Sequence, residues 1–350
     1  MGMSLKILFV GYFKYNSGSS HALLGYVRAA RCLGYDLRAS RFGVIDEAIQ
    51  KIVPVAEKSW VPDIIVLVFE SKQFLSESDI EEIEKLTKHC HTVIIDPDGK
   101  NSDVVKIGLD TNHPTTESQV FWKTFYNRFS DIILQPSISI STTNSKKFLY
   151  FGIDIHRSHN QERNEKRRFD LLYVGNNWYR WQDFVWLFKH LEPIRSKIGR
   201  IAVYGKHWFG DPKQGLEQFT FSDPAFLRVH NIESYPSVPF DEVETVMGQG
   251  KLHPIFIRPI LNTLEFVTPR MFETFAADTV PILPPYFTHA VHLYGKQVLP
   301  LYLTENPADI VITMLEKYPD YLSLVQEIRT NLIKEHTYEV RLSELLGFCF

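Results

Sequence analysis

The chain has 350 residues, which is enough for two domains of ordinary size. Its residues are 44% apolar and 23% charged, a composition that excludes a largely disordered chain. The formal net charge of −3 excludes a global basic field, so we expect neither nucleic acid nor an anionic membrane as a partner.

The first half of the sequence alternates between apolar runs and segments of helical periodicity. We expect strands at residues 6–11, 35–40, 63–69, 91–95 and 131–135, and helices at residues 20–33, 76–89 and 116–129. Ser76 and Asp79 have the spacing of a capping box and predict the start of the second helix. Because strands and helices alternate, the strands should form one parallel, doubly wound sheet.

Residues 137–168 are mostly polar and charged, and the alternation resumes after them. Strands are expected at 169–174, 200–204, 254–257, 280–283 and 297–301, and helices at 181–197, 241–247, 307–317 and 322–346, the last interrupted near 336–337. The predicted fold class is α/β, with two Rossmann-like doubly wound domains facing a cleft. The expected divisions are a first domain at 1–150, a linker at 151–168, a second domain at 169–335 and a terminal helix at 336–350, whose crossing back to the first domain is left open.

The three cysteines, Cys32, Cys90 and Cys349, form no paired motif. We therefore predict free thiols in a reducing compartment. The apolar run at residues 6–10 is too short for a signal peptide, and no stretch is long enough to cross a bilayer. These observations predict a cytoplasmic protein without a transmembrane segment, and they leave its oligomeric state open.

The segment 264–283, LEFVTPRMFETFAADTVPIL, places Glu265 and Glu273 eight positions apart around a predicted helix start. Thr268 suits the N-cap of that helix, and Pro269 suits its first position. Free backbone N–H groups at a helix start attract phosphate, and a carboxylate one turn inside can accept hydrogen bonds from two ribose hydroxyls. The pattern indicates a site for a nucleoside diphosphate joined to a sugar. An ordinary amphipathic helix with solvated glutamates is the alternative.

The Glu-x7-Glu spacing, followed by a small-residue helix and a short VPIL strand, resembles the retaining glycosyltransferases of the GT-B fold. The stretch TPRMFETFAADTVPIL is most similar to their spore-maturation (CgeB-like) branch. That family usually has glycine where Asp278 stands, and aspartate tolerates the left-handed conformation of such a helix end. Gly152-Ile153-Asp154 also resembles the family's interdomain crossing, with a surface loop as the alternative.

The resemblance implies a nucleotide-sugar donor bound mainly by the second domain and an acceptor bound by the first. Glu273 would hold the ribose hydroxyls, and Glu265 would act beside the sugar and the diphosphate as a catalytic residue. Arg180 and Lys206 follow two predicted strands and would neutralise the leaving diphosphate, because cationic side chains bind phosphate oxygens.

Further contacts are expected in the second domain. A helix dipole disfavours a cation at a helix start unless an anion lies nearby, so we rank Arg270 above Arg258 as a phosphate ligand. The stretch 204–208 resembles a YGxxW element of the CgeB-like branch. Tyr204 and Trp208 would then border the base or ribose, and core packing explains these aromatic residues equally well.

The first domain offers two loops. The loop after the first strand lacks a GxGxxG fingerprint, which argues against a dinucleotide site. By the resemblance, Gly18 and Ser19 would contact phosphate and His21 would take part in catalysis, with a flexible loop as the alternative. Asp96 opens an Asp-Pro-Asp-Gly sequence, for which we favour a plain turn; a catalytic role in orienting sugar or acceptor hydroxyls is the second hypothesis.

The expected activity is transfer of a sugar from a UDP-, GDP- or TDP-sugar to a small-molecule, glycan or protein acceptor, with retention implied by the resemblance. Stabilising the leaving diphosphate is then the main catalytic task. The histidines show no metal-site spacing, so no metal or cofactor is expected. The alternatives are a sugar-nucleotide epimerase on the same scaffold and a non-catalytic nucleotide-sugar-binding protein.

Overall fold

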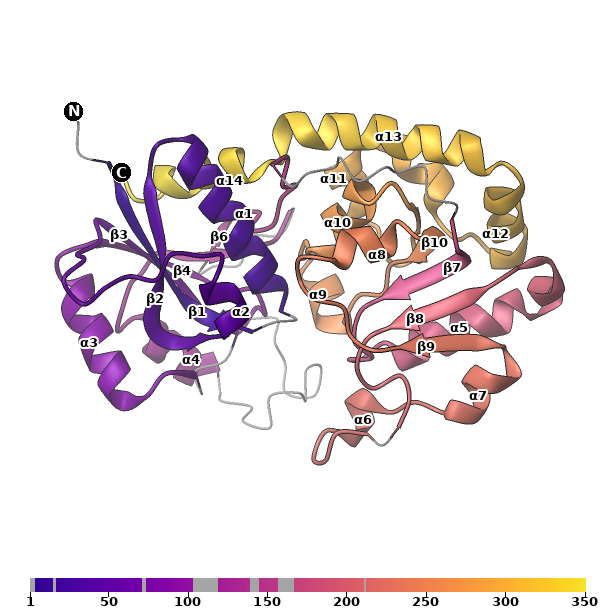
Figure 1. Ribbon diagram of the computed structural model, residues 1–350, viewed down its shortest axis with the longest axis horizontal. Coiled ribbons are helices and arrows are strands. Elements are labelled where there is room, and N and C mark those ends of the chain that lie inside the picture. Colours follow the sequence, from indigo (N-terminus) through magenta and orange to yellow (C-terminus); the bar gives the residue numbers. More distant parts are fainter. Residues whose placement is uncertain are drawn as a thin grey trace. The chain divides into compact units, whose positions relative to one another are not determined.

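The computed structural model describes residues 4–14, 17–70, 74–102, 119–138, 145–156, 167–210 and 212–350. These residues form two compact α/β units, each with its own parallel sheet (Figure 1). Unit 1 comprises Met1–His156, Thr263–Pro269 and Glu335–Phe350, and unit 2 comprises Arg157–Asn262 and Arg270–Lys334. The predicted α/β class is confirmed. In the described residues, no helix is both long and apolar enough to cross a membrane.

The sheet of unit 1 has six parallel strands in the order β2-β1-β3-β4-β5-β6. These strands are β1 (Lys6–Phe13), β2 (Asp36–Ile45), β3 (Ile64–Val68), β4 (His91–Ile95), β5 (Ile133–Gln135) and β6 (Lys146–Lys147). The central strand β3 reads IIVLV and is buried at every position, as expected for a parallel strand with both faces covered.

The helices of unit 1 are α1 (Gly18–Cys32), α2 (Glu47–Gln50), α3 (Glu77–Thr87), α4 (Gln119–Tyr126) and α14 (Tyr338–Gly347). Side chains cap the start of three of them, α1, α3 and α14. Ser17 caps α1 by accepting a hydrogen bond from the backbone of Ser20, and the predicted capping box of Ser76 and Asp79 is present at α3. The C-terminal helix α14 packs against α1 and therefore belongs to the first unit (Figure 1).

The sheet of unit 2 has five parallel strands in the order β11-β10-β7-β8-β9. These strands are β7 (Phe169–Val174), β8 (Ile201–Tyr204), β9 (Ile232–Tyr235), β10 (Gly250–Pro254) and β11 (Val280–Ile282). Its helices are α5 (Trp181–Leu191), η2 (Glu192–Lys197), α6 (Glu217–Thr220), α7 (Pro224–Val229), α8 (Val243–Met247), α10 (Arg270–Ala276), α11 (Ala290–Tyr294), η3 (Lys296–Leu301), α12 (Pro307–Glu316) and α13 (Tyr318–Glu335). A further short helix, α9 (Pro259–Thr263), ends where the chain passes into unit 1.

Several predicted elements differ from the structure for local reasons. The predicted strand at 297–301 is the 3₁₀ helix η3, and Pro300 inside it has no N–H for a sheet ladder. The predicted helix at 181–197 is α-helical only to Leu191, and the 3₁₀ helix η2 follows from Glu192, because Pro193 has no N–H to continue the α-helical hydrogen bonds. The strand expected at 254–257 lies earlier, at β10, and the prediction omits β9. Of the helix expected at 116–129, residues 116–118 lie outside the described residues.

The course of the chain between the units also differs from the expected division. Thr263–Pro269 falls inside the predicted second domain, yet it packs with unit 1, where Val267 N donates to Pro136 O at 2.7 Å. Residues 151–156 of the predicted linker belong to unit 1, and most of the remaining linker lies outside the described residues. The predicted break near 336–337 is confirmed, since Thr337 caps α14.

Candidate functional site

The carboxyl ends of β7 and β8 in unit 2 carry two loops that bind each other. Gly175 N donates to Tyr204 O at 2.7 Å, and Asn177 N donates to Lys206 O at 2.9 Å. A Cβ atom at Gly205 would lie 2.2 Å from Gly175 O, so only glycine permits this approach. Ligands of open α/β sheets bind at the carboxyl ends of the strands. At this end of β7 and β8, the hydrogen bonds between the two loops hold the backbone in place.

Two residues in these loops have left-handed backbone conformations that are costly for residues other than glycine. Tyr179 has φ of 57° and His207 has φ of 64°. The Asn177 side chain holds this region by donating to His207 O at 2.9 Å and to Phe221 O at 2.6 Å. Such strain persists where surrounding contacts over-determine the backbone, and it is concentrated at functional sites.

Arg270, which is partly buried, and Glu273, which is buried, form an ion pair in the first turn of α10. Arg270 Nη1 lies 3.1 Å from Glu273 Oε2, and only 6% of Glu273 is exposed. A Cβ atom at Gly175 would lie 3.0 Å from Arg270 Nη2, so the guanidinium reaches the loop after β7. The Arg270 Nη1 atom is buried, and within the described part of the chain it makes no hydrogen bond of good geometry, because the Glu273 oxygen is near but poorly aligned. An anion beside it would complete its hydrogen bonding.

A second guanidinium lies near the same loop. Arg180 Nε donates to Tyr173 Oη at 3.3 Å, and that hydroxyl would lie 2.9 Å from a Cβ atom at Gly175. His253 adds no charge here, because burial and the nearby Arg270 hold the pKa of this imidazole well below its usual value. Its Nε2 accepts from Val174 N at 3.2 Å, as a neutral ring does. Arg180 and Arg270 therefore bring positive charge to Gly175.

The remaining predicted residues of unit 2 lie in different environments. Trp208 is fully buried and its Nε1 donates to Gly175 O at 2.7 Å, so the ring packs in the core rather than against a ligand. Tyr204 is half-buried and stacks on Tyr235, with ring centroids 4.5 Å apart. Lys206 is exposed, whereas Arg258 is buried immediately before α9.

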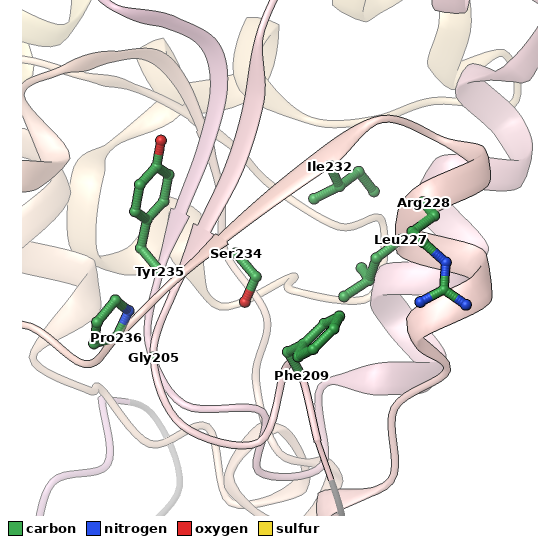
Figure 2. Close-up of a pocket in the computed structure, with 8 residues that line it drawn as sticks. All are labelled: Gly205, Phe209, Leu227, Arg228, Ile232, Ser234, Tyr235 and Pro236. Atoms are coloured by element: carbon green, nitrogen blue, oxygen red, sulfur yellow. The ribbon is translucent and has the colours of Figure 1, made fainter.

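A pocket of about 400 Å³ lies beside these loops in unit 2 (Figure 2). Phe209, from the loop after β8, and Leu227, from α7, reach toward Ser234 of the edge strand β9. Phe209 is 64% exposed, an unusual state for a phenyl ring beside a hollow. Because Gly205 also lines the pocket, it adjoins the loop pair described above.

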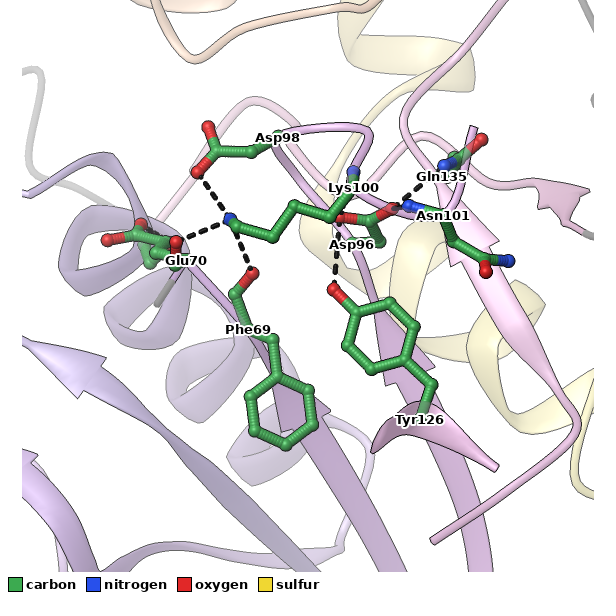
Figure 3. Close-up of polar contacts among 9 residues, drawn as sticks. Phe69, Glu70, Asp96, Asp98, Lys100, Asn101, Tyr126 and Gln135 are labelled. Carbon is green, nitrogen blue, oxygen red and sulfur yellow. Dashed lines mark hydrogen bonds and ion pairs between the residues drawn. The ribbon is translucent and has the colours of Figure 1, made fainter. Parts of the chain in front are cut away.

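In unit 1, Asp96 is fully buried at the end of β4 (Figure 3). Its carboxylate accepts hydrogen bonds of 2.8–3.2 Å from Lys100 N, Asn101 N, Tyr126 Oη and Gln135 Nε2. Four donors occupy both carboxylate oxygens. This geometry matches the turn interpretation and leaves Asp96 no access to a reacting group, in contrast to the catalytic hypothesis.

Sequence reasoning missed three charged residues around that turn (Figure 3). Lys100 Nζ is buried, lies 2.9 Å from Asp98 Oδ2, and also donates to the backbone oxygen of Glu70. The Glu70 carboxylate accepts a hydrogen bond from Ser19 Oγ. A position directly after a buried strand was the available signal for Glu70, as it was for Asp96.

Glu265 lies in the Thr263–Pro269 segment of unit 1 and has a left-handed φ of 51°. Its backbone is fixed at the end of β5, because Ile138 N donates to Glu265 O at 3.2 Å. Among the described residues, its Oε2 is buried without a hydrogen-bond partner. A Cβ atom at Gly18 would lie 2.8 Å from Pro269 Cγ, so this segment also contacts the start of α1, where Ser19 and His21 are buried.

Glu265 and Glu273 therefore belong to different units, although eight positions separate them. The helix that contains Glu273 has 7 residues and starts at Arg270. It therefore starts later and is shorter than the sequence indicated. It ends as expected at Asp278, which is left-handed with φ of 53°. The Asp278 carboxylate forms an ion pair with Arg329.

No protein-family model and no curated protein sequence matches the chain. Among solved structures, it is similar to an alpha-glucosyltransferase in complex with UDP-glucose and DNA containing an abasic site, at 11% identity and a TM-score of 0.65, over 99% of this chain and 100% of that one. It is similar to T4 phage BGT in complex with UDP and Mn²⁺, at 12% identity and a TM-score of 0.58, over 97% and 99%. It is also similar to Anabaena HepE in complex with UDP-glucose, at 11% identity and a TM-score of 0.61, over 98% and 99%.

These similarities extend over whole chains, and they show that the protein has the fold of the GT-B glycosyltransferases. The fold expected from the Glu-x7-Glu segment is thereby confirmed. The similarity at 11–12% identity is one of fold, and it does not distinguish the CgeB-like branch.

Proposed function

We propose that the protein is a glycosyltransferase that moves a sugar from a nucleotide-sugar donor to an acceptor hydroxyl, with retention of anomeric configuration. One observation carries the proposal: the partly buried Arg270 pairs with the buried Glu273, and Arg270 Nη1, although 3.1 Å from Glu273 Oε2, makes no hydrogen bond of good geometry among the described residues. A diphosphate would supply an acceptor for that hydrogen bond. UDP-sugars are the first donors to test, since the similar structures contain UDP or UDP-glucose.

In this proposal, unit 2 binds the donor. The Glu273 carboxylate would accept hydrogen bonds from the ribose hydroxyls, with Arg270 and Arg180 on the diphosphate. Lys206 is exposed on the joined loops and would add a further positive charge. Charge develops on the diphosphate as the glycosidic bond breaks, so fixed cations lower the barrier of the reaction.

The nucleobase would enter the pocket beside Gly205, where Phe209 would stack on it. This role replaces the one expected of Trp208, which is buried in the core. Stacking would remove the exposed phenyl ring of Phe209 from water, and this burial favours binding.

The acceptor would bind unit 1, beside Glu265. Glu70 and Asp98 lie at the carboxyl ends of neighbouring strands there, with Lys100 beside them. A largely acidic edge would repel a phosphate backbone, so we favour a hydroxyl-bearing small molecule or glycan over nucleic acid. Three of the similar structures contain DNA, and DNA therefore serves as the contrasting acceptor in an assay.

The donor site is tested by titrating UDP into purified protein and its variants in a calorimeter. Glu273→Ala and Arg270→Gln should each weaken UDP binding at least about tenfold, because each removes a charged hydrogen-bonding group worth about 1.5–3 kcal/mol. Lys251→Ala is the matched control: it breaks the Lys251–Asp170 pair at the opposite, amino end of the same sheet. Equal UDP affinity in wild type, Glu273→Ala and Arg270→Gln would overturn the proposed site.

Transfer is tested with UDP-sugars and a panel of glycan, small-molecule and DNA acceptors, followed by NMR of the product's anomeric proton. Incubation with donor alone separates the alternatives. A sugar-nucleotide epimerase would convert the donor without any acceptor, and a non-catalytic binding protein would neither transfer nor hydrolyse it. Inversion at the anomeric carbon would contradict the proposed stereochemistry while leaving glycosyl transfer intact.

A further inference from the structure

Three metal-ligating side chains meet in unit 1, away from the strand ends described above. Cys32 is the last residue of α1, His156 precedes the passage of the chain into unit 2, and Glu339 lies in the first turn of α14. Their ligand atoms all lie within 4.8 Å of one another, the single such group in the part of the chain that the structure describes. Cys32 Sγ is 3.4 Å from His156 Nε2, which also contacts the Glu339 carboxylate.

The distance between Cys32 Sγ and His156 Nε2 suits one metal ion bound by both atoms, and Glu339 would join them once its carboxylate moves off His156 Nε2. Thiolate, imidazole and carboxylate are the ligand types of zinc, with bond lengths of about 2.3 Å to sulfur and about 2.0–2.1 Å to nitrogen. At a tetrahedral angle these lengths place the sulfur and the nitrogen about 3.5 Å apart. The observed separation of 3.4 Å therefore requires little movement of either side chain.

The backbone that carries the three ligands is fixed by contacts of its own. His156 N donates to Asp154 Oδ1 at 3.1 Å, and Asp154 forms an ion pair with Arg28, one turn before Cys32 on α1. Ile153 N donates to His336 O at 2.8 Å, immediately before α14. The ligands are thus brought together by a scaffold that exists without the ion, as a tight site requires.

We propose that Cys32, His156 and Glu339 form a zinc site, with water as the fourth ligand, that clamps the C-terminal helix α14 to α1. The ion would replace the contact between His156 and Glu339. Cys32 would bind it as a thiolate and release its proton to the solvent. Cys32 and His156 are exposed and Glu339 is partly exposed, so an ion can enter from solvent. Metal binding would then stabilise the folded state of unit 1 through linkage.

The test uses Co²⁺ as a spectroscopic substitute for zinc on the metal-free full chain. Wild type should bind one equivalent with a thiolate-to-cobalt charge-transfer band, and zinc should displace the cobalt and raise the melting temperature. Cys32→Ser and His156→Gln should abolish the band, and Glu339→Gln should weaken binding at least about tenfold, as loss of a ligand does. Cys90→Ser is the matched control, because Cys90 is a half-buried thiol that is not part of this group.

Absence of a cobalt band at millimolar metal, or a band that persists in Cys32→Ser or His156→Gln, would overturn the zinc site. Neither result depends on sugar transfer. Failure of this proposal is therefore distinguishable from failure of the proposed donor site, which is measured by UDP affinity.

Discussion

Five residues other than glycine have left-handed backbone conformations, in the part of the chain that the structure describes: Tyr179, His207, Asn231, Glu265 and Asp278. Each such conformation costs about 1–2 kcal/mol relative to glycine. Three of them lie at the proposed sites: Tyr179 and His207 in the joined loops of unit 2, and Glu265 in unit 1. Glycine would adopt each of these conformations at a lower free energy. The strain at Tyr179, His207 and Glu265 therefore supports a functional role for these residues.

Two substitutions at Glu265 distinguish an effect on the free energy of unfolding from an effect on sugar transfer. Glu265→Gly and Glu265→Ala should both reduce sugar transfer on the order of 10²-fold, since both remove the carboxylate proposed to act beside the sugar. The glycine variant should nevertheless be more stable than the alanine variant by about 1–2 kcal/mol, because alanine keeps the unfavourable φ. Urea unfolding and initial transfer rates measure the two effects.

Asn231 provides the control for Glu265, because its φ of 50° is nearly the same and it lies between α7 and β9. Asn231→Gly and Asn231→Ala should show a similar difference in stability and leave transfer unchanged. If Glu265→Ala transfers sugar at the wild-type rate, Glu265 has no catalytic role.

At the level of single residues, the sequence predicts what local spacing encodes. The eight-residue spacing correctly placed Arg270 and Glu273 at a helix start, and Asp278 at its left-handed end. It could not show that Trp208 and Asp96 are buried, because their partners come from other elements. The sequence also could not show that Cys32, His156 and Glu339 lie together, because they are far apart along the chain.

Secondary structure elements were predictable where composition and capping agreed. The strands β4 and β7 have the predicted bounds, and α3 begins at the predicted capping box. Elements without a periodic signal were missed, such as the four-residue strand β9, whose IESY sequence has two polar residues. Pairing with β8 stabilises this strand, and a local sequence pattern does not contain such a long-range interaction.

The packing of α14 on α1 depends on a glycine. A Cβ atom at Gly25 would lie 2.3 Å from the ring of Tyr338, which is buried. Gly25→Ala should therefore destabilise unit 1 by about 1–3 kcal/mol and lower its melting temperature by several degrees. Differential scanning calorimetry measures the shift.

Gly347→Ala, in α14 itself, is the matched control for Gly25→Ala. A Cβ atom there meets nothing within 4 Å in the described structure, so alanine should leave the melting temperature nearly unchanged or raise it slightly. A melting temperature for Gly25→Ala equal to that of wild type would show that Tyr338 moves aside at little cost.

The chain divides the two glutamates of the Glu-x7-Glu segment between its two units. The Glu-x7-Glu segment does not form one site on one domain, since Thr263–Pro269 leaves unit 2, packs in unit 1 and returns at Arg270. The sequence predicted two domains correctly from the repeated alternation of strands and helices. It could not reveal this exchange, because seven residues are too few to carry a compositional boundary.

Separate units should respond separately to ligand, and hydrogen exchange can detect this. Each unit has its own buried core, so each can open locally without the other. At 100 times its dissociation constant, UDP should add about 2.7 kcal/mol of stability to unit 2, slowing amide exchange around β7 and α10. Strands β1–β5 of unit 1 should exchange as before, and Glu273→Ala should lose the protection in unit 2. Protection centred on β1–β5 would instead place the nucleotide on unit 1 and reverse the proposed assignment of donor and acceptor.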